Sequence, residues 1–103
     1  GGNGTVLNGI VRGVGINGSP SSIAAGSWLG ASSTTVIFSV TGAEESLHGN
    51  VIINPRFDFP ETLSILSSRV SNDGKITVVF LNSSTSSYSI SGSTKRFDIT
   101  VIQ

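Results

Sequence analysis

The sequence predicts an all-β protein, an antiparallel β-sandwich of seven or eight short strands, on three observations. No window of the 103 residues carries a sustained apolar repeat at i, i+3, i+4 and i+7, so helix signals are nearly missing. Short runs of alternating apolar residues recur between turn residues, as in sandwiches and barrels. Glycine, serine, threonine and β-branched residues dominate, and they favour strands and turns over helices. The length fits one domain, so we expect residues 1–103 to form a single sandwich.

The first segment, residues 5–16, predicts one ragged strand or two short ones with an uneven distribution of glycine. One side of this strand carries Leu7, Gly9, Val11, Gly13 and Gly15. An Asn-Gly pair and a proline then predict a turn near residue 18. The loop that follows contains Ile23 and Trp28, which we expect to be buried anchors.

The clearest strand pattern lies in residues 33–41, where apolar and polar residues alternate. One face carries Val36, Phe38 and Val40, and the other carries Thr35, Ile37 and Ser39. Residues 49–55 predict a short strand that ends at Pro55, because proline cannot donate a hydrogen bond to a neighbouring strand. The next loop contains two aromatic residues on either side of an aspartate, Phe57 and Phe59.

Residues 63–70 predict a strand whose phase changes part-way. Leu63 and Ile65 share one parity, whereas Leu66 and Val70 share the other. A β-bulge inserts one extra residue into a strand and would reconcile the two halves. We therefore expect a bulge within this strand.

The remaining strands form a hairpin and a closing strand. An Asp-Gly pair at 73–74 predicts a tight turn, and Ile76, Val78 and Phe80 alternate after it. A brief strand is expected at 88–90. The last strand is expected to direct Phe97, Ile99 and Val101 inward, with Asp98 and Thr100 outward.

The composition excludes several classes of function. Six basic and six acidic residues give a net charge of zero, so we expect no nucleic-acid partner, which would need a clustered basic surface. No apolar run reaches the length that spans a bilayer, so we expect no membrane partner. Zero cysteines exclude disulfides and thiolate chemistry. The low charge and positive mean hydropathy predict a subunit that packs against copies of itself or a larger particle.

The stretch GVGING, residues 13–18, matches the G-x-G-x-x-G pattern of dinucleotide-binding turns. That motif requires a helix after its last glycine, but the next residues contain Pro20 and two further glycines. We therefore expect no cofactor. The alternating glycines instead predict a strand side on which another backbone or a neighbouring subunit approaches closely, with Gly9, Val11, Gly13 and Gly15 as interface candidates.

No other constellation predicts catalysis or metal binding. His48 is the only histidine, and the adjacent Glu44 and Glu45 point to opposite sides of an extended chain. We expect solvated loop charges and no enzyme. Three N-x-S/T matches, at Asn3, Asn17 and Asn82, are interpreted as chance matches in a chain rich in these residues.

Two interpretations are open for the four aromatic residues in predicted loops, which are Trp28, Phe57, Phe59 and Tyr88. The favoured one is that they cover the ends of the sandwich core, because large aromatics in small domains usually supply core area. The alternative is a surface that stacks on a host glycan or contacts a partner. We retain all four as interface candidates.

From about Ser22 onward the chain resembles a small β-sandwich module of tailed-bacteriophage structural proteins. The matching pieces, in order, are SIAAGS, SSTTVIFSVTGAEESLHGNVIINP, FPETLSI, RVSNDGKITVVFLNSST and SISGSTKRFDITVI. The resemblance implies a jelly-roll sandwich, commonly a homotrimer, that acts by adhesion in capsid decoration (cement) proteins and in tail fibres or spikes. It transfers no catalytic residue.

These observations together predict a virion structural protein, foremost a capsid decoration protein that binds itself and the major capsid protein. Residues 1–18 precede the resemblance and are expected to act as an N-terminal arm or added strand. The alternatives are a tail fibre or spike module that binds host glycans, and an extracellular pilus or surface-layer subunit. The chain begins at Gly1, so we expect trimming of methionine or, in the pilus case, of a leader.

Overall fold

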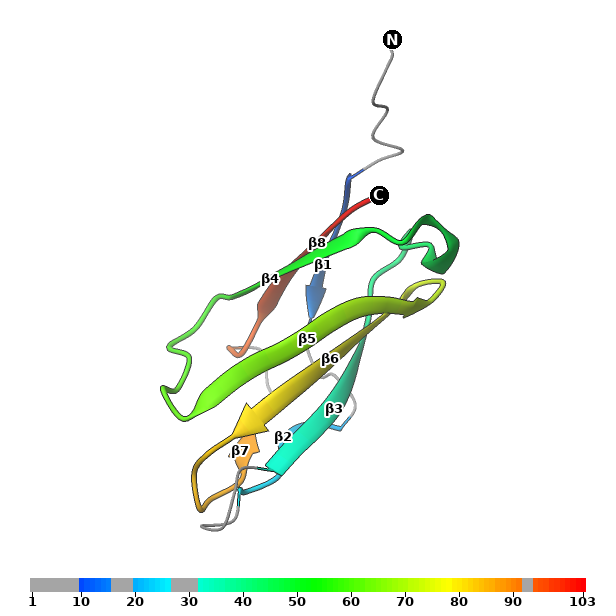
Figure 1. The fold of residues 1–103 in the computed structure, drawn as a ribbon. Coiled ribbons are helices and arrows are strands. Elements are labelled where there is room, and N and C mark those ends of the chain that lie inside the picture. The colour runs from blue at the N-terminus through cyan, green and yellow to red at the C-terminus, as the bar shows by residue number, and fades with distance from the viewer. Residues whose placement is uncertain (1–9, 16–19, 27–31, 92–93) are drawn as a thin grey trace, which may run out of the picture.

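The computed structural model describes residues 10–15, 20–26, 32–91 and 94–103 (Figure 1). Within these ranges the strands are antiparallel and the protein is all-β, which confirms this part of the predicted fold class. The strands are β1 (Ile10–Gly15), β2 (Ser22–Ile23), β3 (Ser32–Ser39), β4 (Asn50–Pro55), β5 (Leu63–Asn72), β6 (Lys75–Asn82), β7 (Tyr88–Ser89) and β8 (Phe97–Ile102). A short 3-10 helix, η1 (Glu45–Leu47), precedes β4. No helix in the part of the chain described is long and apolar enough to cross a membrane.

Sheet A consists of β1, β8 and β4, in that order. The central strand β8 pairs antiparallel with β1 on one side and with β4 on the other, and neither pairing has a register shift. Phe97, Ile99 and Val101 are completely buried, as their alternation predicts. Asp98 and Thr100 therefore lie on the opposite, outer face of the sheet.

Sheet B consists of β3, β6 and β5, with β6 in the centre. The predicted faces are confirmed, since Val36, Phe38 and Val40 are buried whereas Thr35, Ile37 and Ser39 are exposed. The predicted bulge in β5 is also confirmed. The register shifts between Ile65 and Ser67, which leaves Leu66 unpaired and 56% exposed.

The hairpin between β5 and β6 turns at the predicted Asp73-Gly74 pair. Of these two turn residues, Gly74 alone takes a positive φ, of 75°. Glycine adopts this φ without the steric cost that a Cβ would add. The backbone of Gly74 also joins the end of β3, donating to the carbonyl of Ala43 at 2.7 Å and accepting from the N–H of Val40 at 2.9 Å. The turn therefore fixes one end of both outer strands of sheet B.

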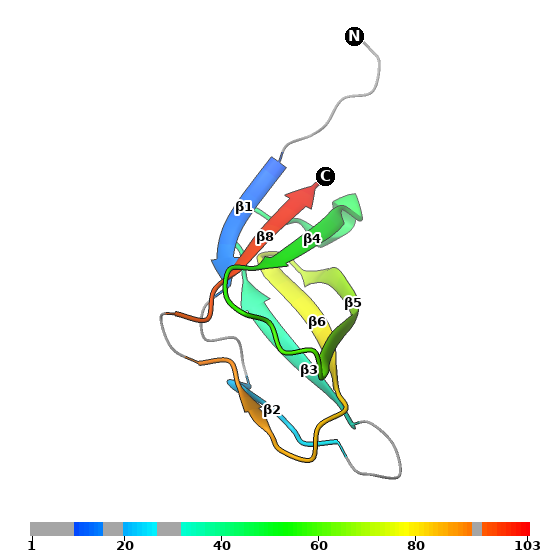
Figure 2. The same ribbon diagram turned by 90° about the vertical axis from the view of Figure 1, so that its left-hand side faces the viewer.

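The inner faces of the two sheets pack on each other and enclose one apolar core (Figure 2). Phe97 of sheet A lies 5.4 Å from Phe38 and 5.8 Å from Phe80 of sheet B, measured between ring centroids. At the two sides of this sandwich, β1 lies beside β3 and β4 lies beside β5. Each sheet thus has its two edge strands at the sides of the molecule.

A short ribbon of β2 and β7 covers the end of the sandwich at which β6 finishes (Figure 1). Ile23 of β2 is completely buried, as predicted, and so is Ile90, which directly follows β7. The described residues thus form two three-stranded sheets and a ribbon, whereas a jelly roll arranges eight strands in two sheets. The sandwich arrangement is observed, and the jelly-roll topology is not confirmed.

Candidate interaction surface

The outer face of sheet A displays apolar side chains beside polar ones. Ile10 of β1 and Ile52 of β4 are 52% and 51% exposed, and Ile102 of β8 lies opposite Ile10 in the register. Arg12 and Ile52 flank Thr100 from either side. Alternation along the strands causes this display, because Val11 and Ile53 point inward to the core. This face, defined by Ile10, Arg12, Ile52, Asp98, Thr100 and Ile102, is called the sheet A surface below.

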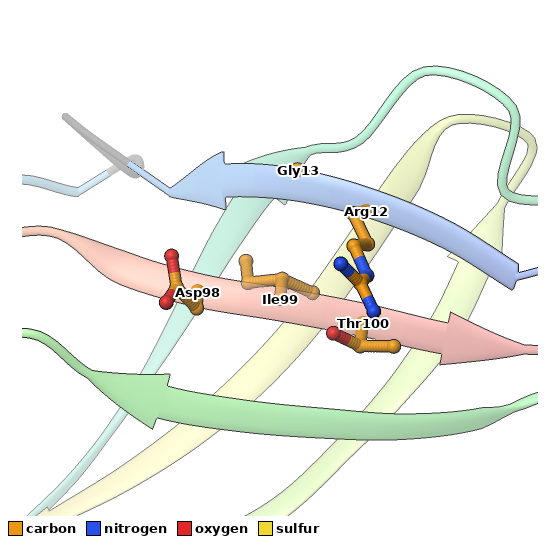
Figure 3. A pocket seen from close by; sticks show the side chains of 5 residues that line it. All are labelled: Arg12, Gly13, Asp98, Ile99 and Thr100. Carbon is orange, nitrogen blue, oxygen red and sulfur yellow. The ribbon is translucent and has the colours of Figure 1, made fainter.

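A shallow hollow of about 340 Å³ lies on this surface, lined by Arg12, Gly13, Asp98, Ile99 and Thr100. Figure 3 shows the Arg12 side chain reaching from β1 across to Thr100 on β8, with Asp98 farther along the same strand. The Asp98 carboxylate accepts from Arg56 Nε at 3.1 Å, and both side chains are largely exposed. Such an exposed ion pair contributes little to stability.

Arg12 has no ion-pair partner among the described residues. The hydroxyl of Thr100 adds a donor and acceptor within the same hollow. The hollow thus combines a guanidinium and a hydroxyl with the exposed isoleucines beside it.

The glycine-rich side of β1 faces the protein's own core. A Cβ added at Gly13 would meet the two methyl groups of Val40 at 3.0 Å, and Val11 packs on the core nearby. This close approach arises because β1 lies beside β3, so its inner side must fit over the end of that strand. The close neighbour that the glycines predicted is thus found within the same chain at Gly13. A contact of Val11 or Gly13 with a partner subunit stays a prediction.

The other glycine candidates and Trp28 are not among the residues that define the sheet A surface. Gly15 ends β1 opposite Phe97 in the register. Gly9 and Trp28 lie outside the described residues, as do residues 1–9 and 16–18 of the predicted arm. Residues 10–15 of that arm form an edge strand of the chain's own sheet.

Two of the aromatic candidates lie together at the edge of the core. The Phe57 ring meets Phe97 edge-on, with centroids 5.2 Å apart, and lies 5.9 Å from Phe59. Both rings are half-buried. This packing confirms that Phe57 and Phe59 cover the core, and stacking on a glycan would have to use their remaining exposed parts.

Tyr88 also packs against the core from the ribbon. Lys95 Nζ lies 4.4 Å from the Tyr88 ring centroid, a cation–π contact, and donates to the carbonyl of Ser89. The exposed side of this ring is therefore occupied by a lysine of the same chain. A partner at Tyr88 would have to displace it or bind both groups together.

Asn82 is a buried polar residue whose structural role the sequence analysis missed. Its side-chain amide nitrogen donates to the carbonyls of Ala24 at 3.1 Å and Ser86 at 3.0 Å, and its oxygen accepts from the N–H of Ser84 at 2.9 Å. Because the residue is completely buried, it is not an accessible glycosylation acceptor in the folded chain. The available signal was parity, since Asn82 continues the inward series of Ile76, Val78 and Phe80.

The remaining charged candidates are loop residues. Glu44 precedes η1 and Glu45 is its first residue, both exposed, and His48 follows that helix with a left-handed φ of 47°. In the ranges that the structure describes, no three His, Asp or Glu side chains gather in a way that could hold a metal ion. These residues contribute surface charge around the loop that leads into β4.

Comparisons with known proteins give no relative for this chain. No protein-family model matches it, and neither a curated protein nor a solved structure does so at a significant level. The resemblance to phage structural modules accordingly stays a prediction from the sequence.

Proposed function

We propose that the chain is a structural module of a bacteriophage virion, foremost a capsid decoration protein, that acts by docking. The observation that carries the proposal is the sheet A surface. Two isoleucines are half exposed there beside Arg12, which has no ion-pair partner in the described part of the chain, and 12% of the residues are charged. An apolar surface with a polar rim is typical of a protein–protein contact.

The placement of the resembling pieces supports the same proposal. The second piece contains all of β3 and all of β4, and the fourth contains the end of β5, the hairpin turn and all of β6. The pieces therefore correspond to sandwich strands and the loops between them, as a shared architecture requires. The homotrimer and the major capsid protein partner remain expectations from the resemblance.

The test is to locate the protein on particles and to break its contact. We expect antibody labelling of purified particles to place regular copies on the head shell. Purified protein should rebind to particles that lack it, and Ile52→Lys should weaken this binding at least tenfold by adding a charge to the sheet A surface. Ile37→Lys is the matched control, because Ile37 is 45% exposed but lies on sheet B.

The location of the copies distinguishes the alternative functions. Copies on the tail would favour the fibre or spike module, and copies on a cell-surface filament would favour the pilus or surface-layer subunit. Absence of the protein from particles, with no binding to them, would contradict the virion proposal. Equal binding of Ile52→Lys and the unmodified chain to particles would show that the contact does not use the sheet A surface.

A further inference from the structure

The edge strands of the two sheets differ in how well they are protected against pairing with another strand. β4 is short and ends in Pro55, which lacks a backbone N–H. β1 contains two glycines and a charge, Arg12. β5 has two register shifts and carries Arg69. Bulges, prolines and edge charges are the devices by which proteins block edge-to-edge pairing.

β3 has none of these devices. Its eight residues, SSTTVIFS, contain no charge, proline or glycine, and all eight pair with β6 without a shift. The described part of the chain gives β3 no hydrogen-bonded strand on its other side. Every second residue of an edge strand directs its N–H and C=O away from its neighbour, so β3 presents a regular row of such groups with no strand partner among the described residues.

The side chains of β3 also favour an added strand. Valine, isoleucine, phenylalanine and threonine have high strand propensity, and Thr35 and Ile37 are exposed on the outer face. The inner face is complete, because Val36 and Phe38 are already buried. A strand added at this edge would extend sheet B and cover Ile37.

We propose that the β3 edge is a self-association site at which β3 of a second copy pairs antiparallel about a twofold axis. The joined sheet would run β5-β6-β3 in one copy and β3-β6-β5 in the other. This inference goes beyond the proposed function and does not depend on it, since it uses only the edge geometry of sheet B.

Charge selects a second copy as the occupant. A twofold contact brings the same strand of both copies side by side, so a charge near the middle of the strand lies close to the same charge of the other copy. β1 would oppose Arg12 to Arg12 and β5 would oppose Arg69 to Arg69, whereas β3 opposes only neutral residues. The nearest cation, Lys75 on β6, lies at one end and donates to the Ser39 hydroxyl at 2.9 Å.

The size of the contact sets the strength of the association. One strand edge and one isoleucine per copy cover less than the roughly 800 Å² per partner of a standard interface. The dimer should therefore be weak and should depend on concentration. It also differs from the trimer that the resemblance implies, so the mass of the complex separates the two.

The experiment is sedimentation equilibrium of the full chain over a wide concentration range. The unmodified chain should fit a monomer–dimer equilibrium, and Ile37→Lys should weaken the dimer at least tenfold, because it brings one lysine of each copy to the joined edge. Ile52→Lys is the matched control, an equally exposed isoleucine on an edge strand of sheet A, and should leave the dimer unchanged. If Ile37→Lys does not fold, Thr35→Lys introduces the same charge at a second exposed position of β3.

Several results would overturn the proposal. These are a chain that stays monomeric up to its solubility limit, a trimer that is insensitive to the β3 variants, or a dimer lost in Ile52→Lys but kept in Ile37→Lys. The result is independent of particle binding. A dimer that fails to bind particles contradicts only the virion proposal, and a monomer that binds them contradicts only the β3 contact.

Discussion

β3 and β5 flank the same central strand, yet they form very different edges. β3 follows β6 for eight consecutive residue pairs, whereas the pairing of β5 shifts at Leu66 and again before the hairpin turn. Both strands contribute buried residues to one core. The difference therefore lies in what each strand offers to a neighbour on its outer side.

Burial of a strand's inner face and protection of its outer edge against pairing are therefore separate properties. The bulge at Leu66 keeps Leu63 and Val70 buried while it bends the outer edge away from regular geometry. β3 achieves the same burial by strict alternation, and its outer edge stays regular as a result. A regular edge is a template for pairing.

Replacing Asn82 should have the largest effect, because this residue lies opposite Ser32 of β3 and Leu63 of β5 and so joins both edges at one end. Asn82→Ala removes the bonds to the segments that flank the ribbon and leaves the partly buried carbonyls of Ala24 and Ser86 without this donor. We expect a loss of about 3 kcal/mol in the free energy of unfolding. Chemical denaturation measures it.

Ser83→Ala is the control for Asn82, since that hydroxyl is exposed and bonds only the carbonyl of Thr62. It should change the free energy of unfolding by less than about 0.5 kcal/mol. Equal effects of the two substitutions would show that the buried amide does not hold the ribbon to the sheet.

Replacing Gly13 should have a smaller effect that is confined to the β3 side of the sandwich. In Gly13→Ala the new methyl group would meet the methyls of Val40 at 3.0 Å, so β1 and β3 must move apart slightly. We expect a loss of about 1–2 kcal/mol from overpacking. Thermal unfolding measures it.

The double variant Gly13→Ala with Val40→Ala tests the origin of that loss. It should cost less than the sum of the two single substitutions, because the smaller residue makes room for the new methyl group. If the two losses of stability are additive, the loss in Gly13→Ala does not come from a contact with Val40.

Removing the bulge should have the smallest effect on stability and should make the two edges alike. Deletion of Leu66 takes out the unpaired, exposed residue and lets Ser67 follow Ile65 in register. We expect stability to change by less than about 1 kcal/mol. Self-association should increase in sedimentation experiments, because only the register shift near the hairpin turn would still interrupt the β5 edge.

A combined variant identifies the edge responsible. Deletion of Leu66 together with Ile37→Lys should leave association through β5 alone, weakened by Arg69. If deletion of Leu66 leaves the dimer constant unchanged, the bulge does not protect the edge.

Much of the strand pattern could be predicted from the sequence, because it is local. Val36 and Phe38 in β3, and Ile99 and Val101 in β8, show their faces by alternation alone. The conflict of phase between Ile65 and Leu66 was enough to predict the bulge. Each of these conclusions needs only neighbouring residues.

The order of the strands could not be predicted, because it depends on distant pairing. No local signal indicates that β8 lies between β1 and β4, nor that Gly13 faces Val40. The glycines of β1 showed that something approaches closely, and only the fold identifies the neighbour as the same chain. The sheet A surface likewise depends on which strands lie side by side.

Amide hydrogen exchange at low and high protein concentration tests most directly whether β3 is the edge strand at which a second copy pairs. We predict that amides within Ser32–Ser39 gain protection as the concentration rises, whereas those of Leu63–Asn72 exchange at the same rates at both concentrations. Equal gains in both strands, or none in β3, would contradict the account.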